Sequence, residues 1–378
     1  MSPKRLIEVL STMPDPRVAR TRIHKLVDIL VIALLAMINN GTDGWEDLAD
    51  FAEAREKWLG GFLELPGGVP CADTFRRVFE ALDPRMFGEC MAQMTADFNA
   101  DVQGKVVAID GKTLRGSFDR RRGRSALHVI SAWVSEAGIT LGQIVTEEKS
   151  NEITAIPELL QTIDVRGATV TLDAMGCQKT IAALIVDGGA DYALALKENH
   201  PTLRAEVEAA FEFPKATGAR KKDIETCREE SQGHGRHEVR RVTVRRNVEC
   251  ITESDDWKGL RSLVMVERER TIDGKTSHET AYYLSSLSES APRMAKCIRT
   301  HWSIENNLHW TLDVVFGEDK SRIRSRHGAA NLTQVRKLAL SLLKLESSRS
   351  KKSIVKKRKI AGWEPDYAFA VLSMISVV

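Results

Sequence analysis

Hydrophobic residues recur at helical spacing through the first hundred residues of the chain. The apolar run LVDILVIALLAMI predicts a buried helix around residues 24–38. It stops at Asn39-Asn40-Gly41, because Asn and Gly tolerate the left-handed conformation of a helix end. A second helix is predicted around Trp45, and a third over residues 72–84 with Asp73 as its N-cap. The pattern predicts a helical domain over residues 1–100.

From residue 105 the pattern changes to short apolar runs of the kind found in buried strands. The order of elements is strand, strand, strand, helix, strand, helix, strand, helix, which is the order of the ribonuclease H fold, a mixed sheet with helices on both faces. The expected elements are strands over residues 105–110, 126–134 and 139–146, a helix over 151–163 capped by Asn151, a strand over 168–174, a helix over 177–187, a strand over 191–197 and a helix over 200–211.

Residues 220–290 interrupt this order with polar, alternating segments such as HEVRRVTVRR, which predict a β-rich insertion. Helix returns at residues 292–316 and 331–345. We therefore expect an α/β protein with a helical N-terminal domain. Its ribonuclease H-like domain comprises residues 101–219 and 291–346, the insertion is residues 220–290, and residues 347–378 form a basic stretch with an apolar C-terminal segment.

Composition and net charge change this picture little, since 28% charged residues and a net charge of +3 are ordinary for a soluble protein. The basic residues nevertheless gather in three clusters, which favour a polyanionic partner. Any one of them is equally typical of a solvated face or a loose tail. The clusters are Arg115–Arg124 with five arginines, Arg236–Arg246 with five, and Arg349–Lys359 with seven Lys or Arg and no acid.

The cysteines and the apolar runs argue against several classes of protein. None of the six cysteines forms a CxxC pair, which argues against a cysteine zinc site and a secreted disulfide framework, so we expect a reducing cytoplasm. The longest apolar run, Ile29–Ile38, is too short to cross a bilayer, so no membrane association is expected.

Two aspartates end predicted strands that lie side by side in this fold. Asp110 ends the first strand and Asp173 the fourth, so their carboxylates should be neighbours at one edge of the sheet. Hard oxygen ligands of this kind suit Mg²⁺ or Mn²⁺, and two such ions can support an in-line displacement at phosphorus. Either aspartate alone is better explained as a polar strand end.

A third acid is expected on the helix RTHWSIENNLHWTLDVVFGEDKSRIR, residues 299–324. Glu305 is the best candidate, because its neighbours can bind phosphate or stack on bases; these neighbours are His301, Trp302, Asn306 and His309. Alternatively, His301, Glu305 and His309 could bind zinc, which would leave both aspartates without a role. Rival carboxylates are Asp313, Glu318 and Asp319, of which Asp313 is the most serious.

Long motifs that include these acids make the chain similar to a known family. It resembles the DDE transposases of bacterial insertion sequences, in particular the group that includes the H-repeat-associated proteins. The resemblance covers nearly the whole chain. Its motifs are MPDPR, DTFRRVF with LDP, AIDGKTLRGS, EKSNEITAIPELL, TLDAMGCQKTIA, GADYALALKENHPTL, HWSIENNLHWTLDVVFGED and NLTQVRKLALSLLK.

The resemblance implies that Asp110, Asp173 and Glu305 are the catalytic, metal-binding acids. Related transposases carry a Tyr, an Arg and a Lys around the glutamate, and here Ile298, His301 and Leu312 stand at those positions. We therefore expect other residues to contact DNA. The candidates are Lys112, Arg115, Lys197, His301, Trp302, Asn306 and His309.

The function implied is DNA transposition: Mg²⁺- or Mn²⁺-dependent cleavage at element ends and joining of the 3′-hydroxyl to target DNA, with two ions. The partners would be double-stranded DNA at terminal inverted repeats and at the target, bound by a homodimer. The helical N-terminal domain would be a DNA-binding module or a cap on the catalytic domain. Two alternatives remain, a nuclease of the same superfamily that does not join strands, and a decayed or domesticated DNA-binding element product.

Overall fold

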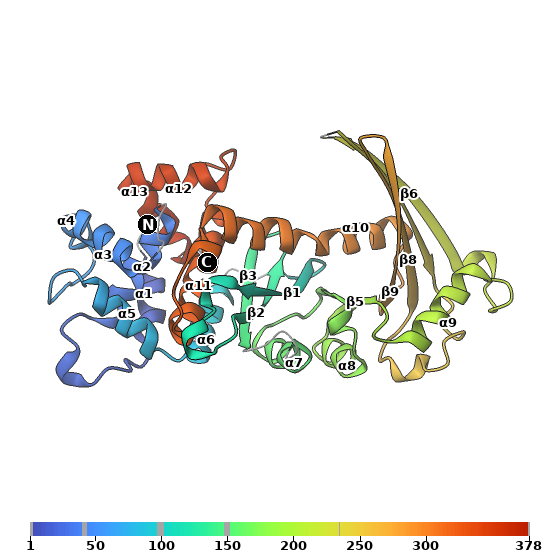
Figure 1. Ribbon diagram of the computed structural model, residues 1–378, viewed down its shortest axis with the longest axis horizontal. Coiled ribbons are helices and arrows are strands. Elements are labelled where there is room, and N and C mark those ends of the chain that lie inside the picture. The colour runs from blue at the N-terminus through green and yellow to red at the C-terminus, as the bar shows by residue number, and fades with distance from the viewer. Residues whose placement is uncertain (1–2, 40–43, 97–101, 147–151, 234, 377–378) are drawn as a thin grey trace. The chain divides into compact units, whose positions relative to one another are not determined.

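The computed structural model describes residues 3–39, 44–96, 102–146, 152–233 and 235–376. The chain divides into two compact units. The first comprises Met1–Asp101, Gly111–Asn151 and Ile304–Val378, and the second comprises Val102–Asp110 and Glu152–Ser303. One division falls inside strand β1 (Val106–Leu114), so each unit contains part of that strand. Figure 1 labels the elements along the chain.

Two buried helices form the centre of the first unit. Helix α2 (Leu26–Ile38) is apolar on all sides and almost wholly buried, as its sequence predicts. Helix α11 (Arg326–Leu345) packs against α2, α5, α6 and β3, and begins earlier than the predicted residue 331. The other helices of this unit are α1 (Lys4–Ser11), α3 (Trp45–Ala54), α4 (Glu56–Leu59), α5 (Ala72–Ala81), α6 (Pro84–Ala96), α12 (Ile354–Trp363) and α13 (Pro365–Leu372).

The predicted N-cap of α5 is wrong. The helix begins at Ala72, after Cys71, so Asp73 lies in its first turn. The Asp73 carboxylate instead accepts hydrogen bonds from the side chains of Arg76 and Arg77, one turn further along the helix. These i, i+3 and i, i+4 pairs occupy the carboxylate that was expected to cap the backbone. The predicted stop at Asn40 and Gly41 lies outside the described residues, although α2 does end at Ile38.

The first unit also contains the predicted hairpin. Strands β2 (Leu127–Val134) and β3 (Ile139–Thr146) pair antiparallel, with Gly138 in the left-handed conformation in the turn. The strand order in this unit is β3-β2-β1. The helix predicted over residues 292–316 is divided: α10 (Ala291–His301) belongs to the second unit, and the π-helical segments η8 (Ile304–His309) and η9 (Thr311–Val315) belong to the first.

In the second unit the strand order is β1-β4-β5-β9-β8-β7-β6. Strands β1, β4 (Thr169–Leu172) and β5 (Asp191–Leu196) are parallel. Figure 1 shows α7 (Glu152–Thr162) and α8 (Lys179–Asp187) on one face of these strands and α10 on the other. The predicted order of elements and the ribonuclease H-like mixed sheet flanked by helices are confirmed, with α9 (Pro201–Glu212) closing the series. The predicted cap Asn151 lies outside the described residues.

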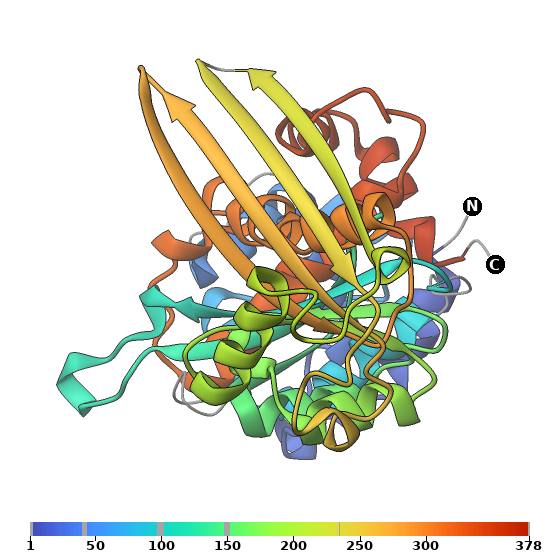
Figure 2. The same ribbon diagram turned by 90° about the vertical axis from the view of Figure 1, so that its right-hand side faces the viewer.

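The β-rich region continues the sheet of the second unit. Its four strands are antiparallel, and β9 pairs with β5 (Figure 2). Val242, Val244 and Val264 on one face pack against Met294 and Ile298 of α10, which fixes that helix over the sheet. The predicted domain boundaries stay a prediction. The strands are β6 (Ile224–Gly233), β7 (Arg236–Arg245), β8 (Ser262–Ile272) and β9 (Lys275–Ser285).

Candidate active site

Asp110 lies within β1, and Asp173 directly follows β4, the neighbouring parallel strand. The last pair in the ladder between β1 and β4 is Ile109 with Leu172, so each aspartate is the next residue in the same register. Neighbouring strands are about 4.8 Å apart. The structure therefore brings these two predicted acids together within the second unit, and both side chains are partly exposed at this edge.

A third carboxylate, which sequence reasoning missed, acts on Asp173. Burial and the negative charge of Glu152 raise the pKa of Asp173, while backbone N–H groups of Met175 and Gly176 and the charge of Lys197 lower it. Glu152 itself is 4% exposed at the start of α7. In the sequence, Glu152 stands in the EKSNEITAIPELL motif, which was read as a helix start and as part of the family resemblance, with no role given to Glu152. Negative charge concentrated in this way favours a bound cation.

The pair of aspartates fits a divalent ion. Among the described residues, no group of three or more His, Cys, Asp or Glu side chains is arranged to hold a metal. Magnesium, however, is commonly held by one or two carboxylates and completes its shell with waters and substrate phosphates. Asp110 and Asp173 could supply that set of donors.

The loop after β5 holds the loop that carries Asp173. Asn199 Nδ2 donates a hydrogen bond to the carbonyl of Ala174 over 2.8 Å, and His200 Nε2 donates to that of Cys177 over 2.6 Å. Sequence reasoning assigned neither residue a role, although KENHP directly follows a strand end. Lys197, a predicted DNA contact, is exposed at the start of the same loop, close enough for its charge to act on Asp173.

His301 and Trp302 end helix α10 in the second unit. His301 Nδ1 is hydrogen-bonded to Thr171 Oγ1 over 2.9 Å, and Thr171 shares a face of β4 with Asp173 two residues on. Burial lowers the pKa of His301 to about 4, so this ring is neutral near pH 7. Trp302 is 41% exposed, and the guanidinium of Arg268 lies 5.2 Å from the centre of its ring.

The predicted third acid belongs to the first unit. Glu305 and Asn306 are exposed on the π-helical segment η8, a winding that often occurs at functional sites. His309 on the same segment is half-buried, and burial together with the charges of Lys337 and Lys112 lowers its pKa to about 3. The alternative zinc site at His301, Glu305 and His309 assumes the i, i+4, i+8 spacing of one α-helix, whereas Glu305 and His309 lie on a π-helical segment.

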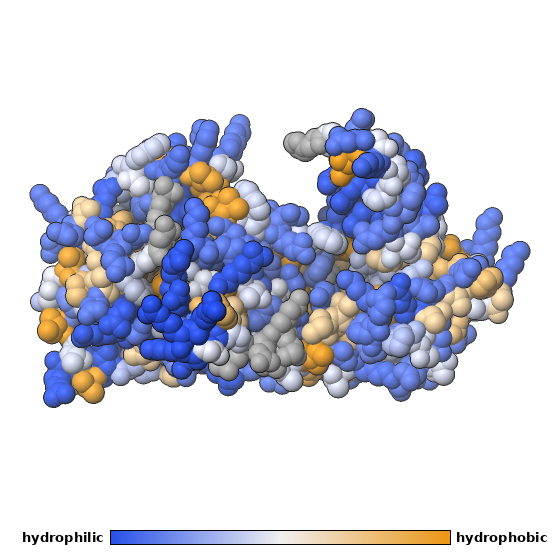
Figure 3. Space-filling model, viewed as in Figure 1, coloured by the Kyte–Doolittle hydropathy of each residue, from blue (hydrophilic) through white to orange (hydrophobic). Residues whose placement is uncertain are grey.

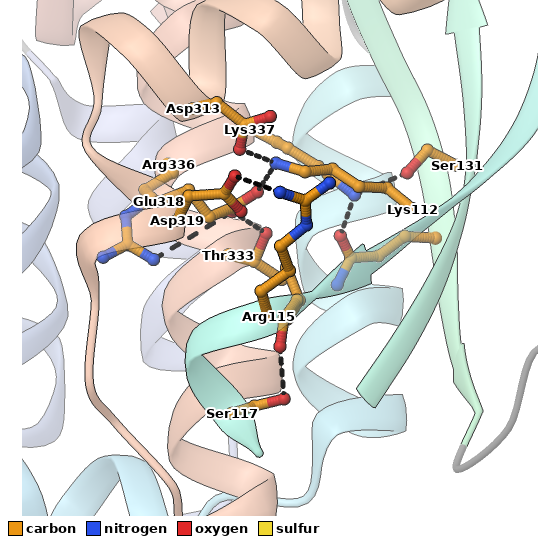
Figure 4. Close-up of polar contacts among 12 residues, drawn as sticks. Lys112, Arg115, Ser117, Ser131, Asp313, Glu318, Asp319, Thr333, Arg336 and Lys337 are labelled. Atoms are coloured by element: carbon orange, nitrogen blue, oxygen red, sulfur yellow. Dashed lines mark hydrogen bonds and ion pairs between the residues drawn. The ribbon is translucent and has the colours of Figure 1, made fainter. Parts of the chain in front are cut away.

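The rival carboxylates are engaged by Lys112. Its ammonium binds the Asp313 carboxylate and, over 2.7 Å, Oε2 of Glu318 (Figure 4). Lys112 is only 12% exposed, so its charge is already neutralised where a DNA contact was predicted. Arg115, another predicted DNA contact, directly follows β1, is 81% exposed and lies 4.0 Å from Asp319.

Glu318 is the centre of a buried network in the first unit. Its Oε1 accepts a hydrogen bond from Thr333 and lies 4.0 Å from Arg336 Nη1. Burial alone would raise the pKa of Glu318, but the charges of Lys112, Arg336 and Lys337 lower it to about 2. A carboxylate buried and neutralised in this way is unavailable as a metal ligand, and its removal would leave buried cations short of a partner.

Comparison with known families shows which family the chain with these acids belongs to. The model of the transposase DDE domain matches residues 102–342, and that of the DDE_Tnp_1-associated region matches residues 7–95. This chain belongs to the DDE transposases. The match includes both aspartates, Glu305 and the whole β-rich region, and it confirms the resemblance drawn from the motifs.

Individual relatives of this DDE transposase are bacterial. It is 38% identical to the "H repeat-associated putative transposase YhhI" of Escherichia coli (strain K12) over 378 residues, covering 99% of each chain. It is also 38% identical to the "Putative transposase YncI" of Escherichia coli O157:H7, covering 100% of this chain and 96% of that one. A solved synaptic complex of piggyBac transposase with hairpin DNA aligns with a TM-score of 0.44 at 10% identity over 99% of this chain and 80% of that chain, a likeness too weak to support a conclusion. In the described part of the chain, no helix is long and apolar enough to cross a membrane.

Proposed function

We propose that this DDE transposase cuts DNA at the ends of its element and joins each freed 3′-hydroxyl to target DNA, with Asp110, Asp173 and Glu305 as its catalytic acids. The observation that carries the proposal is the register of β1 and β4, because it sets two carboxylates side by side at a partly exposed strand edge. Membership of the family supports the reaction class.

The carboxylates would hold the metal on which the reaction depends. Asp110 and Asp173 would bind Mg²⁺ or Mn²⁺, with Glu305 completing the protein ligands, and two bound ions would supply stabilisation of the charge on the attacking and leaving oxygens. Water or a DNA 3′-hydroxyl is the nucleophile, so no covalent bond between protein and DNA is needed. Asn199 and His200 position Asp173 by holding its loop.

The choice of Glu305 over Asp313 rests on their contacts. Asp313 is bound by the Lys112 ammonium, so using it as a ligand would require breaking that ion pair. Glu305 is exposed and follows the HWSI motif on which the resemblance rests. Residues flanking the acids would contact DNA: Lys197 close to Asp173, and Trp302, Asn306 and His309 around Glu305. Lys112 would act as a positioning residue instead.

Two element ends must be cut and joined together, so we expect the protein to act as a homodimer on DNA in the cytoplasm. DNA phosphates would be its polyanionic partner, and binding should weaken as salt increases.

The test uses the purified full-length chain, Mg²⁺, a duplex carrying the element end with flanking DNA, and a supercoiled target. The wild type should cleave at the end and yield a joined product, while Asp110→Asn and Asp173→Asn should bind the duplex with unchanged affinity and give no product. The matched control is Asp164→Asn, an exposed aspartate in the same unit that pairs with Arg166, and it should retain full activity.

Other outcomes separate the alternatives. Cleavage without joining would replace the proposal with a nuclease. DNA binding without product in either Mg²⁺ or Mn²⁺ would indicate a decayed element product, and unchanged cleavage by Asp173→Asn would remove that residue from the active site.

A further inference from the structure

The three basic clusters of the sequence differ in how much positive charge they leave available. In the second cluster, Arg245 is fully buried and donates to the carbonyls of Ala210 and Thr217, while Arg236 and Arg240 lie against the buried carboxylate of Glu238. Lys357 and Arg358 of the third cluster are also buried. The first cluster, Arg115–Arg124, is different: its five arginines are all exposed.

This arginine loop, residues 115–124, has a defined shape. The buried carboxylate of Asp119 accepts hydrogen bonds from the backbone N–H groups of Arg121 and Arg122, over 3.1 and 3.3 Å. Asp119 and Arg124 exchange two backbone hydrogen bonds, and Gly123 takes the left-handed conformation at the tip (φ 62°). Figure 2 shows the loop, in teal, projecting between β1 and β2. These backbone contacts hold the loop while its arginines stay exposed; two of them lie near a carboxylate, Arg122 at 3.9 Å from Asp119 and Arg115 at 4.0 Å from Asp319.

A second arginine segment, residues 322–326, packs beside the arginine loop in the same unit. A Cβ on Gly116 would lie 1.7 Å from the carbonyl oxygen of Ser321, so only glycine permits this approach. After Ser321 the chain alternates, with Ile323 buried and Arg322 and Arg324 exposed. Within the described residues, five arginines of the two segments make no ion pair with a carboxylate. They are Arg120, Arg121, Arg124, Arg322 and Arg324.

Two clefts lie between these segments. A larger one, of about 730 Å³, is bordered by Arg76 of α5 and contains a single carboxylate, Glu80; its remaining lining is Arg122, Gly123, Arg124, Ser125, Ser325, Arg326 and His327. A smaller one, of about 490 Å³, is lined by Phe118, Arg120, Arg121 and Arg324. Figure 3 shows the strongly hydrophilic side chains gathered over this part of the surface.

We propose that the arginine loop and its two clefts bind the phosphodiester backbone of a DNA duplex without reading its base sequence. The inference rests on the proposed function. It assigns to these residues the contacts to DNA that do not depend on base sequence. A guanidinium group can donate two parallel hydrogen bonds to phosphate oxygens. Where it has no carboxylate partner, it can do so without breaking an ion pair. Contacts to phosphates fix the position of a protein on DNA and carry no base information.

The main test compares two double variants of the full-length chain by fluorescence anisotropy. Arg122→Gln with Arg124→Gln removes two charges from the larger cleft. The control, Arg166→Gln with Arg220→Gln, removes two equally exposed arginines of the second unit that pair with Asp164 and Asp223. Both are titrated against an element-end duplex and a duplex of unrelated sequence, from about 50 to about 200 mM salt.

Loss of two phosphate contacts should lower the slope of log Kd against log salt by about 2 in the cleft variant. The decrease in this slope should be the same for the element-end duplex and the unrelated duplex, and the control variant should keep the wild-type slope. A wild-type slope and Kd in the cleft variant would overturn the proposal, and so would a loss confined to the element-end duplex, because the loop would then read sequence.

A gain of binding separates the proposal from damage to the fold. Glu80→Gln removes the one carboxylate of the larger cleft and leaves Arg76, whose Nη1 lies 3.2 Å from it, with Asp73 as its carboxylate partner. Both duplexes should bind this variant more tightly than the wild type at low salt, and unchanged or weaker binding would count against the cleft. If the wild type cleaves element ends and the cleft variant keeps the wild-type salt slope, only this inference is contradicted. If the cleft variant loses salt slope but the wild type cleaves no DNA, only the proposed function is contradicted.

Discussion

The arginine loop (residues 115–124) and the C-terminal basic segment (residues 349–359) look alike in sequence and differ in structure. Lys357 Nζ donates to the carbonyls of Leu343 and Glu346 over 2.7 and 2.5 Å, beside the end of α11. Arg358 donates to the carbonyls of Met37 and Val315 and lies over the ring of Phe316. The arginines of the loop are exposed, and their backbone is held by Asp119.

The difference shows that the surroundings of a cation decide its role. Carbonyls at the end of a helix carry partial negative charge and need donors, so a buried cation there serves the fold. An exposed cation on a loop held by its backbone, such as Arg120, Arg121 or Arg124, is available to an external anion. The sequence hints at this difference: Lys357 and Arg358 are interleaved with Ile354, Val355 and Ile360 of a helix, whereas the loop contains two glycines and an aspartate that form a turn.

The largest effect expected from this comparison is on stability. Arg358→Met should lower the free energy of unfolding by about 3–5 kcal/mol, because it leaves buried carbonyls without donors. Arg124→Gln should change it by less than about 0.5 kcal/mol. Urea denaturation of the two variants measures both values. Equal stabilities would mean that the buried cation serves no structural purpose.

A smaller effect of the same kind is expected for the buried anion. Glu318→Gln should cost about 3 kcal/mol, since Lys112 and Arg336 each lose a buried carboxylate partner. The pKa of Glu318 is lowered in the fold, so its stabilisation is complete above its ordinary pKa and is lost as pH falls from about 4.5 toward about 2. Acid unfolding of the variant should lack this component. If the variant lost stability at low pH just as the wild type does, Glu318 would not be the group responsible for that loss.

Lys337 should give the smallest effect, visible as a dependence on pH. Burial lowers its pKa to about 7, and its ammonium donates to Ser131 and Gln143, which carry no charge. The unfolded chain binds this proton more tightly, so stability should rise as pH increases from about 7 to the ordinary lysine value of 10.5. Thermal unfolding of Lys337→Met should lack that rise. If the stability of the variant and of the wild type rose with pH in the same way, Lys337 would not be the source of the rise.

Sequence patterns predicted the parts of the fold that depend on local periodicity. The strand order and the pairing of Asp110 with Asp173 followed from short apolar runs that each end in a carboxylate. Strand β1 extends to Leu114, beyond the predicted end at Asp110. Polar Lys112 and Thr113 are stabilised there by Glu318 and His128, partners distant in sequence that no local pattern contains.

The features that were missed depend on tertiary contacts. Glu152 was read as a helix start because its burial beside Asp173 is set by the packing of α7. The π-helical winding of η8 was missed because helical spacing in sequence does not distinguish α from π. Glu305 was chosen from its neighbours in sequence and from the motif, since no strand register places it beside the two aspartates.

The most direct test of the account compares Glu305→Gln with Asp313→Asn in the Mg²⁺-dependent cleavage assay, with the unfolding temperature of each variant as the control for folding. Glu305→Gln should abolish cleavage and leave the unfolding temperature unchanged, since the side chain is exposed. Asp313→Asn should keep cleavage and unfold at a lower temperature, because Lys112 loses one partner. Cleavage retained in Glu305→Gln and lost in Asp313→Asn would contradict the account, because Asp313 would then be the third catalytic acid.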